Sequence, residues 1–260
     1  MIDEKSILKV YNSIYFTMDK LQSALNSILF VEKFTPPNTA LTDGAKHIHD
    51  VFWDDSFNRN LRLQDVEIEI RLGKAPPSGK GSFNTNIPER MFNVMCESLQ
   101  SFTKWDNSFQ KRDLVGYFPD IDESMRIVQD ESGTTVISKQ KVLQADFVGK
   151  DLPFDFRLAV NLELKINDKV NMNTATRTVV RDRVSYCLGN IRYDLTKLTY
   201  ANGKKEFQVE LEIIDPPEIQ LTCVNAQAIT LEIQHRLVNL MNACEPVRSF
   251  HVELLRKRHF

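Results

Sequence analysis

The sequence of 260 residues lacks several features that define whole classes of protein. With 9 glycines and 10 prolines, it is neither collagen-like nor of low complexity. No stretch approaches the roughly 18 consecutive apolar residues that a membrane-spanning helix needs. Residues 1–5 lack a basic start followed by an apolar stretch, so no secretory signal is predicted. We therefore expect a globular protein with no membrane partner.

An excess of positive or negative charge is also missing. The chain has 33 Lys and Arg against 35 Asp and Glu, which gives a formal net charge of −2. A basic surplus, which nucleic-acid binders often show, is absent. Cysteine is scarce, and the four residues form no C-x-x-C pair, so reduced thiols are favoured over disulfides or a zinc site. With 42% hydrophobic residues, the chain can bury a sizeable core, as one large domain or two small ones.

Helical spacing of apolar residues occurs towards both ends of the chain. It predicts helices over residues 3–34 and 40–57, over 88–102, and then over 225–243 and 247–256. Paired prolines at 36–37 and 216–217 interrupt the pattern. These breaks separate a helical N-terminal segment and a helical C-terminal segment from the middle of the chain.

The middle of the chain alternates apolar and polar residues, as strands do. Residues 65–72 alternate strictly, and residues 104–214 form a series of short strands and turns, with hairpin turns expected at 130–133 and 201–204. Consecutive strands joined by tight turns pair antiparallel, and many of them favour a sandwich or a closed barrel. Strands are expected at 124–129, 135–143, 155–166, 178–188, 190–200 and 205–214.

The prediction is therefore a single α+β domain with an antiparallel β-sandwich or β-barrel at its centre. Residues 1–60 would form a helical segment that packs on this β-structure or makes a dimer interface. Residues 61–215 would form the β-structure, and residues 216–260 would form helices that pack on it.

The polar positions of these strands carry like charges side by side. Because successive side chains of a strand point to opposite faces, residues two apart share one face. The like-charged pairs are Glu67 with Glu69, Glu210 with Glu212, and Arg181 with Arg183. Each pair alone is explained by a solvated polar face. The flanking amphipathic helices, however, need an apolar surface to cover, and the apolar strand faces would supply it. The charged faces would then point into the lumen of a closed barrel.

A lumen lined with unlike charges is costly to desolvate unless it binds a ligand. Paired carboxylates suit a hard divalent cation. Arginine and lysine opposite them suit phosphate oxygens. Together these groups are typical of phosphoryl-transfer chemistry.

Five motifs in this order resemble the fungal-type RNA 5′-triphosphatases of the triphosphate tunnel metalloenzyme family. The first is Val66–Gly73, whose sequence is VEIEIRLG. The others lie at residues 125–127 with 138–141, 154–163, 181–186 with 191–196, and 207–213. A single E-x-E strand is a weak signal, whereas the ordered set spans residues 65–214.

The resemblance implies a closed barrel of eight antiparallel strands that encloses a hydrophilic tunnel. It also implies a catalytic set of glutamates, in which a Mg²⁺ or Mn²⁺ ion is held by Glu67, Glu69 and Glu212. Glu163 and Glu210 match glutamates that position or activate water. The phosphate-binding residues would be Arg126, Lys139, Arg181 and Arg183. Arg192 and Asp194 would orient the basic side chains.

The implied reaction removes the γ-phosphate from the 5′-triphosphate end of nascent mRNA, which is the first step of capping. The implied setting is the nucleus, with a homodimer that meets the mRNA guanylyltransferase or the phosphorylated RNA polymerase II tail. Two alternatives stay open. One is a tripolyphosphatase or nucleoside triphosphatase of the same superfamily, and the other is a non-catalytic barrel that serves as an interaction module.

Overall fold

The computed structural model describes residues 66–77, 81–119, 122–166, 170–214, 223–248 and 250–259. The helices expected over residues 3–34 and 40–57, and with them the N-terminal segment 1–60, lie outside the described residues. The described elements, in chain order, are β1 (Val66–Gly73), α4 (Glu89–Ser101), β2 (Asn107–Phe118), β3 (Asp122–Asp130), β4 (Gly133–Lys150), β5 (Asp155–Ile166), the short 3₁₀ helix η2 (Met172–Thr174), β6 (Arg177–Leu188), β7 (Ile191–Tyr200), β8 (Lys205–Ile213), α5 (Cys223–Asn242) and β9 (His251–His259).

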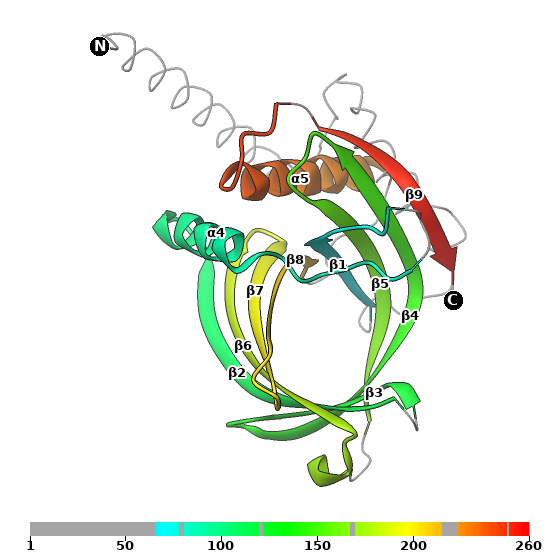
Figure 1. The fold of residues 1–260 in the computed structure, drawn as a ribbon. Coiled ribbons are helices and arrows are strands. Elements are labelled where there is room, and N and C mark those ends of the chain that lie inside the picture. The colour runs from blue at the N-terminus through cyan, green and yellow to red at the C-terminus, as the bar shows by residue number, and fades with distance from the viewer. Residues whose placement is uncertain are drawn as a thin grey trace. The chain divides into compact units, whose positions relative to one another are not determined.

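Within the described residues, eight antiparallel strands close into a ring. Neighbouring strands pair in the order β3-β2-β6-β7-β8-β1-β5-β4, and pairing of β3 with β4 completes the circle. Figure 1 looks into this ring, with β2 and β6 on one side and β4 and β5 on the other. The closed antiparallel barrel of eight strands predicted from the sequence is confirmed.

Strand β4 is long enough to have two partners on the same edge. Its first part pairs with β3, and its last part pairs with β9, from Leu143 opposite His259 to Lys150 opposite His251. The helix predicted over residues 247–256 is therefore wrong, because most of that segment belongs to strand β9. The local apolar spacing favoured a helix, but an unpaired stretch of β4 offered backbone hydrogen bonds that only a strand satisfies. The C-terminal segment 216–260 thus contains helix α5 followed by a strand.

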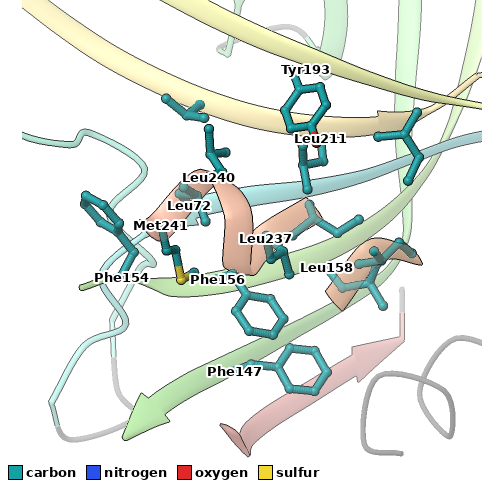
Figure 2. Packing of buried hydrophobic residues seen from close by; sticks show 14 of the residues in the cluster. Leu72, Phe147, Phe154, Phe156, Leu158, Tyr193, Leu211, Leu237, Leu240 and Met241 are labelled. Atoms are coloured by element: carbon teal, nitrogen blue, oxygen red, sulfur yellow. The ribbon is translucent and has the colours of Figure 1, made fainter. Parts of the chain in front are cut away.

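The hydrophobic core lies outside the ring of strands. Ile68, Ile70 and Leu72 of β1 are each at most 2% exposed and belong to one cluster with residues of both helices. Figure 2 shows Leu237 of α5 close to Phe156 of β5, with Phe147 of β4 beside that ring. The apolar faces of the strands are therefore buried under the helices.

Helix α4 follows Pro88 and buries a single stripe. Phe92, Met95 and Leu99 recur at the spacing of one helical face, and all three are buried. The indole N–H of Trp105 donates to the carbonyl of Leu99 at 2.9 Å and so satisfies part of the last turn. Among the described residues, no helix is both long and apolar enough to cross a membrane.

The two predicted hairpin turns join β3 to β4 and β7 to β8. Gly133 has φ of 132° and Gly203 has φ of 81°, values that residues with a Cβ rarely adopt. Both glycines follow short polar residues, as the sequence indicated. These turns make the neighbouring strands antiparallel and fix their register.

Replacing Phe156 with Ala is expected to lower the free energy of unfolding by about 3–5 kcal/mol. The phenyl group of Phe156 is fully buried, and its centre lies 4.9 Å from the centre of the Phe147 phenyl group. Leu164→Ala is the control, because Leu164 is on the same strand but is 37% exposed, and its cost is expected to stay below about 1 kcal/mol. Urea unfolding followed by circular dichroism measures both. Equal losses would contradict a core outside the ring.

Candidate active site

The charged faces of the strands point into the ring. Glu69 is only 3% exposed, yet its neighbours Ile68 and Ile70 belong to the outer core, so its side chain points the other way. In the β1–β8 register Glu69 lies directly opposite Glu212. The predicted reversal, with apolar side chains outside and charged side chains inside, is confirmed.

The lumen contains a cavity of about 140 Å³. It is lined by Glu67, Glu69, Arg71, Arg126, Val128, Ile137, Lys139, Glu163, Arg181, Arg183, Arg192, Glu210 and Glu212. Every site residue predicted from the sequence is among them except Asp194. A larger and more open hollow of about 730 Å³ lies among Ile127, Val136 and Met172, and none of the predicted site residues line it. The smaller cavity is the candidate active site because the titratable groups converge there.

Lys139 lies between three carboxylates. Its ammonium contacts Glu67 and is 3.4 Å from Glu69 Oε1 and 3.3 Å from Glu163 Oε1. The amide of Asn161 donates to both Glu67 Oε2 and Glu69 Oε1 at 3.0 Å. These contacts join β1, β4 and β5 on the inner face of the ring.

Burial raises the pKa of Glu67 to about 7, and the neighbouring Glu69 carboxylate adds to the effect. Burial also raises the pKa of Glu212 to about 8, although a nearby arginine opposes it. At Glu69 the effect of burial is outweighed by Arg71 and Lys139, which lower its pKa to about 2. The adjacent cations therefore do not fully balance the carboxylates of Glu67 and Glu212, and a further cation would favour their ionised forms.

Arg71 and Arg183 both contact Glu210, and Arg71 also contacts Glu69. Arg71 Nη2 donates to Glu69 Oε2 at 2.8 Å, and its Nε lies 2.8 Å from Glu210 Oε1, although the N–H is not aimed for a hydrogen bond. Arg183 Nη2 lies 3.5 Å from Glu210 Oε2. Glu210 is thus held between two guanidinium groups.

The arginines of β6 are held by acceptors on the neighbouring strands. Both Nε and Nη2 of Arg181 donate to the carboxylate of Asp113, at 2.8 and 2.7 Å. Arg183 Nε donates to Thr196 Oγ1 at 3.0 Å, and its Nη1 lies 3.0 Å from Asp194 Oδ2. Because each planar group has its position fixed, its remaining N–H groups are aimed before any ligand arrives.

Asp194 lies behind the cavity surface, with 0% of its side chain exposed. It accepts hydrogen bonds from Ser185 Oγ at 2.6 Å and from Arg192 Nε at 3.0 Å. Arg192 in turn donates to Glu212. Asp194 therefore links two arginines, Arg183 and Arg192, which is the geometry of an orienting residue.

Arg126 has the loosest acidic contact in this group. Its Nη1 lies 4.0 Å from Glu163 Oε1, and its side chain is 22% exposed. Glu163 is itself 32% exposed, so both side chains have a face open to the lumen.

Three charged or amide side chains of this arrangement were not predicted from the sequence. Arg71 stands inside the first motif, and its inward position follows from the same alternation as Glu67 and Glu69. Asp113 lies on β2, a strand without a motif, so only the alternation around it would have shown it. Asn161, between the two β1 glutamates, has no charge to draw attention to it.

Such a cavity can bind an anion on its arginines while its carboxylates take up a cation or position water. In the described part of the chain, no three His, Cys, Asp or Glu side chains are already spaced around a metal ion. The carboxylates of Glu67 and Glu69 instead meet the ammonium of Lys139. All candidate ligands are oxygen donors, which is the chemistry that Mg²⁺ and Mn²⁺ prefer.

The family model of the mRNA capping enzyme, beta chain (the mRNA triphosphatases), matches residues 78–249. This range is about two thirds of the chain and covers β2 to β8 with both helices. It begins after β1, so the two β1 glutamates lie outside it. A comparison with curated proteins found no match.

Two solved structures have the same fold. The RNA triphosphatase Pct1 of S. pombe superimposes with a TM-score of 0.66 over 81% of this chain and 98% of its own, at 16% identity. The structure of Pct1 in complex with the Spt5 CTD gives 0.65 at the same identity and coverage. At this identity the likeness establishes the barrel architecture, and the site rests on its own geometry.

Asp113→Asn is expected to lower the free energy of unfolding by about 2–3 kcal/mol, because it removes the charge that pairs with the partly buried guanidinium of Arg181. The matched control is Asp182→Asn, on the other face of the same two strands. Asp182 pairs with Arg112 at 3.5 Å, and these side chains are 38% and 76% exposed, so its loss is expected to cost about 0.5 kcal/mol or less. Urea unfolding compares the two variants. Equal costs would show that the pair of Asp113 with Arg181 contributes no more than a surface pair.

Proposed function

The chain belongs to the mRNA capping enzyme beta chain family, the mRNA triphosphatases, and we propose that its lumen removes the γ-phosphate from the 5′-triphosphate end of nascent mRNA. The product would be the 5′-diphosphate end to which the cap is added. The observation that carries the proposal is the convergence of five glutamates and six cationic side chains on one small cavity inside a closed ring.

We assign the basic residues to the phosphate groups. Arg181 and Arg183 present planar forks that match phosphate oxygens, and Lys139 supplies a point charge. Arg126, on β3 between β2 and β4, would contact the same substrate. Together they would stabilise the charge that spreads over the phosphate oxygens as the bond to the γ-phosphorus breaks.

We assign a divalent ion, Mg²⁺ or Mn²⁺, to Glu67, Glu69 and Glu212. The donor set fits such an ion, because every ligand would be a carboxylate oxygen and the pKa values of Glu67 and Glu212 are raised by burial. When bound, the ion would neutralise part of the triphosphate charge. Asn161 keeps Glu67 and Glu69 side by side, and Arg192 fixes Glu212, so the protein orients these carboxylates itself.

Of the two glutamates predicted to act on water, Glu163 has the more suitable setting. Its carboxylate is 32% exposed, so a water molecule has access to it. Glu210 is 8% exposed and lies between Arg71 and Arg183. We therefore assign Glu163 to hold the attacking water and Glu210 to position the two arginines.

The triphosphate group alone satisfies the contacts named so far, so free tripolyphosphate and nucleoside triphosphates are competing substrates. The rate on triphosphate-ended RNA relative to tripolyphosphate separates these possibilities. A rate on RNA below that on tripolyphosphate at equal concentration would favour the alternative.

From the family we infer action in the nucleus as a homodimer. Pct1 has been solved with the Spt5 CTD, and we infer a tail-like peptide partner for this chain as well, with the guanylyltransferase and the phosphorylated RNA polymerase II tail as further candidates. Light scattering after size-exclusion chromatography tests the dimer, and a monomeric mass at micromolar concentration would contradict it.

Glu69→Gln is expected to lower kcat for γ-phosphate release from triphosphate-ended RNA by at least about a hundredfold, because it removes one charged oxygen donor and the partner of Arg71 and Lys139. The wild type is expected to require Mg²⁺ or Mn²⁺ and to lose activity in EDTA. Glu97→Gln, on the exposed face of α4, is the control and should leave kcat unchanged. Near-normal release by the Glu69 variant would refute the assignment.

A further inference from the structure

One end of the lumen carries an aromatic and cationic pair that the reaction leaves unused. Tyr117 of β2 lies opposite Arg177 on β6 and opposite Arg126 on β3. The Arg177 guanidinium carbon is 4.6 Å from the centre of the Tyr117 ring. Tyr117 is half-buried, whereas Arg177 is exposed, so the pair stands at the boundary between lumen and solvent.

A second tyrosine lies on the same inner face. Tyr200 of β7 is opposite Val179, the residue between Arg177 and Arg181 on that face of β6. Its hydroxyl donates to Glu206 Oε2 at 2.7 Å, and Lys204 Nζ is 2.7 Å from the other oxygen of Glu206. Burial and Glu206 raise the pKa of Tyr200 to about 12, so the hydroxyl keeps its proton at neutral pH. We call Tyr117, Arg177 and Tyr200 the tyrosine mouth.

The strand register places the phosphate-binding residues next to this mouth. On the inner face of β6, Arg183 and Arg181 are followed by Val179 and then by Arg177. Arg126 is the direct cross-strand neighbour of Tyr117. A triphosphate with its γ end at Glu69 and Glu212 that runs along β6 past Arg183 and Arg181 would therefore direct its nucleoside towards the tyrosine mouth.

We propose that Tyr117 and Arg177 form a stacking subsite for the first base of the RNA, which makes the enzyme prefer triphosphate-ended RNA over free tripolyphosphate. This subsite rests on the proposed function. Guanidinium planes and aromatic rings stack on bases largely without regard to sequence, as suits an enzyme that acts on every transcript. Tripolyphosphate has no base and gains nothing from the pair.

The opposite end of the lumen offers a natural control. Phe109 is also on the inner face of β2 and is 40% exposed, but it lies opposite Ser185, on the other side of Arg183 from Arg177. Phe109→Leu removes an exposed ring from the same strand without touching the tyrosine mouth.

The test compares kcat/KM on a triphosphate-ended oligonucleotide and on tripolyphosphate for the wild type, Tyr117→Leu, Tyr117→Phe and Phe109→Leu. Loss of one base–aromatic stack is expected to lower kcat/KM on RNA about tenfold for Tyr117→Leu, mainly through KM. The kcat/KM of Tyr117→Leu on tripolyphosphate should stay within about twofold of the wild type. Tyr117→Phe and Phe109→Leu should keep the wild-type ratio of kcat/KM on RNA to kcat/KM on tripolyphosphate. Thermal unfolding checks that all variants are folded.

A second readout does not depend on turnover. RNA with 2-aminopurine as its first base should lose fluorescence on binding to the wild type and to Tyr117→Phe, and much less on binding to Tyr117→Leu. The subsite would be overturned if Tyr117→Leu lowered kcat/KM equally on RNA and on tripolyphosphate. It would also be overturned if Phe109→Leu lowered kcat/KM on RNA alone. If the wild type hydrolysed tripolyphosphate but not RNA, the proposed function would fail, and the fluorescence titration would still decide whether the base stacks at Tyr117.

Discussion

A lumen lined with charge depends on burial of the opposite face of the same strands. In β1, Ile68 and Ile70 pack under the helices while Glu67 and Glu69 point inward, so a single strand supplies both core and site. The helices α4 and α5 provide the apolar surface that lets the strands reverse the usual arrangement. A shift of one residue in register would exchange the two faces and would bury charge in the core. The hydrophobic contacts outside the ring therefore hold the charged groups of the lumen in place.

The charges inside the ring must also satisfy one another before substrate arrives. Arg181 is paired with Asp113 and Arg183 with Asp194, in both cases across neighbouring strands. Lys139 of β4 reaches past β5 to Glu67 of β1. Such pairs offset the cost of removing ions from water only where geometry and hydrogen bonds are good, as they are for Arg181. The same contacts fix the guanidinium planes. The stability of the barrel and the fixed orientation of its guanidinium groups thus have one physical origin.

The sequence was most informative where one strand determines its own faces. Alternation predicted β1, β5 and β8, and the apolar surface that the flanking helices need to cover placed Glu69 and Glu212 inside. The ordered motifs added Arg126 and Lys139 to the same site. The sequence was least informative where the conformation or the role of a segment depends on a partner strand. Residues 247–256 have helical spacing, and nothing local shows that the last part of β4 needs a neighbour. Asp113 was missed for the same reason, because its importance depends on Arg181, which is 68 positions away in the chain.

Closure of the ring explains how a chain with a net charge of −2 can act on a polyanion. Acidic and basic residues cancel in number, but they are spread unevenly around the lumen. Three arginines, Arg177, Arg181 and Arg183, share one face of β6, so one part of the lumen is locally positive while the whole protein is not. The described strands close into a ring, and the end of an RNA chain enters such a ring more readily than its middle. Selection of the triphosphate end therefore needs no basic groove along the RNA. What remains to be recognised beyond that end is the first nucleoside, and the tyrosine mouth lies where the register places it.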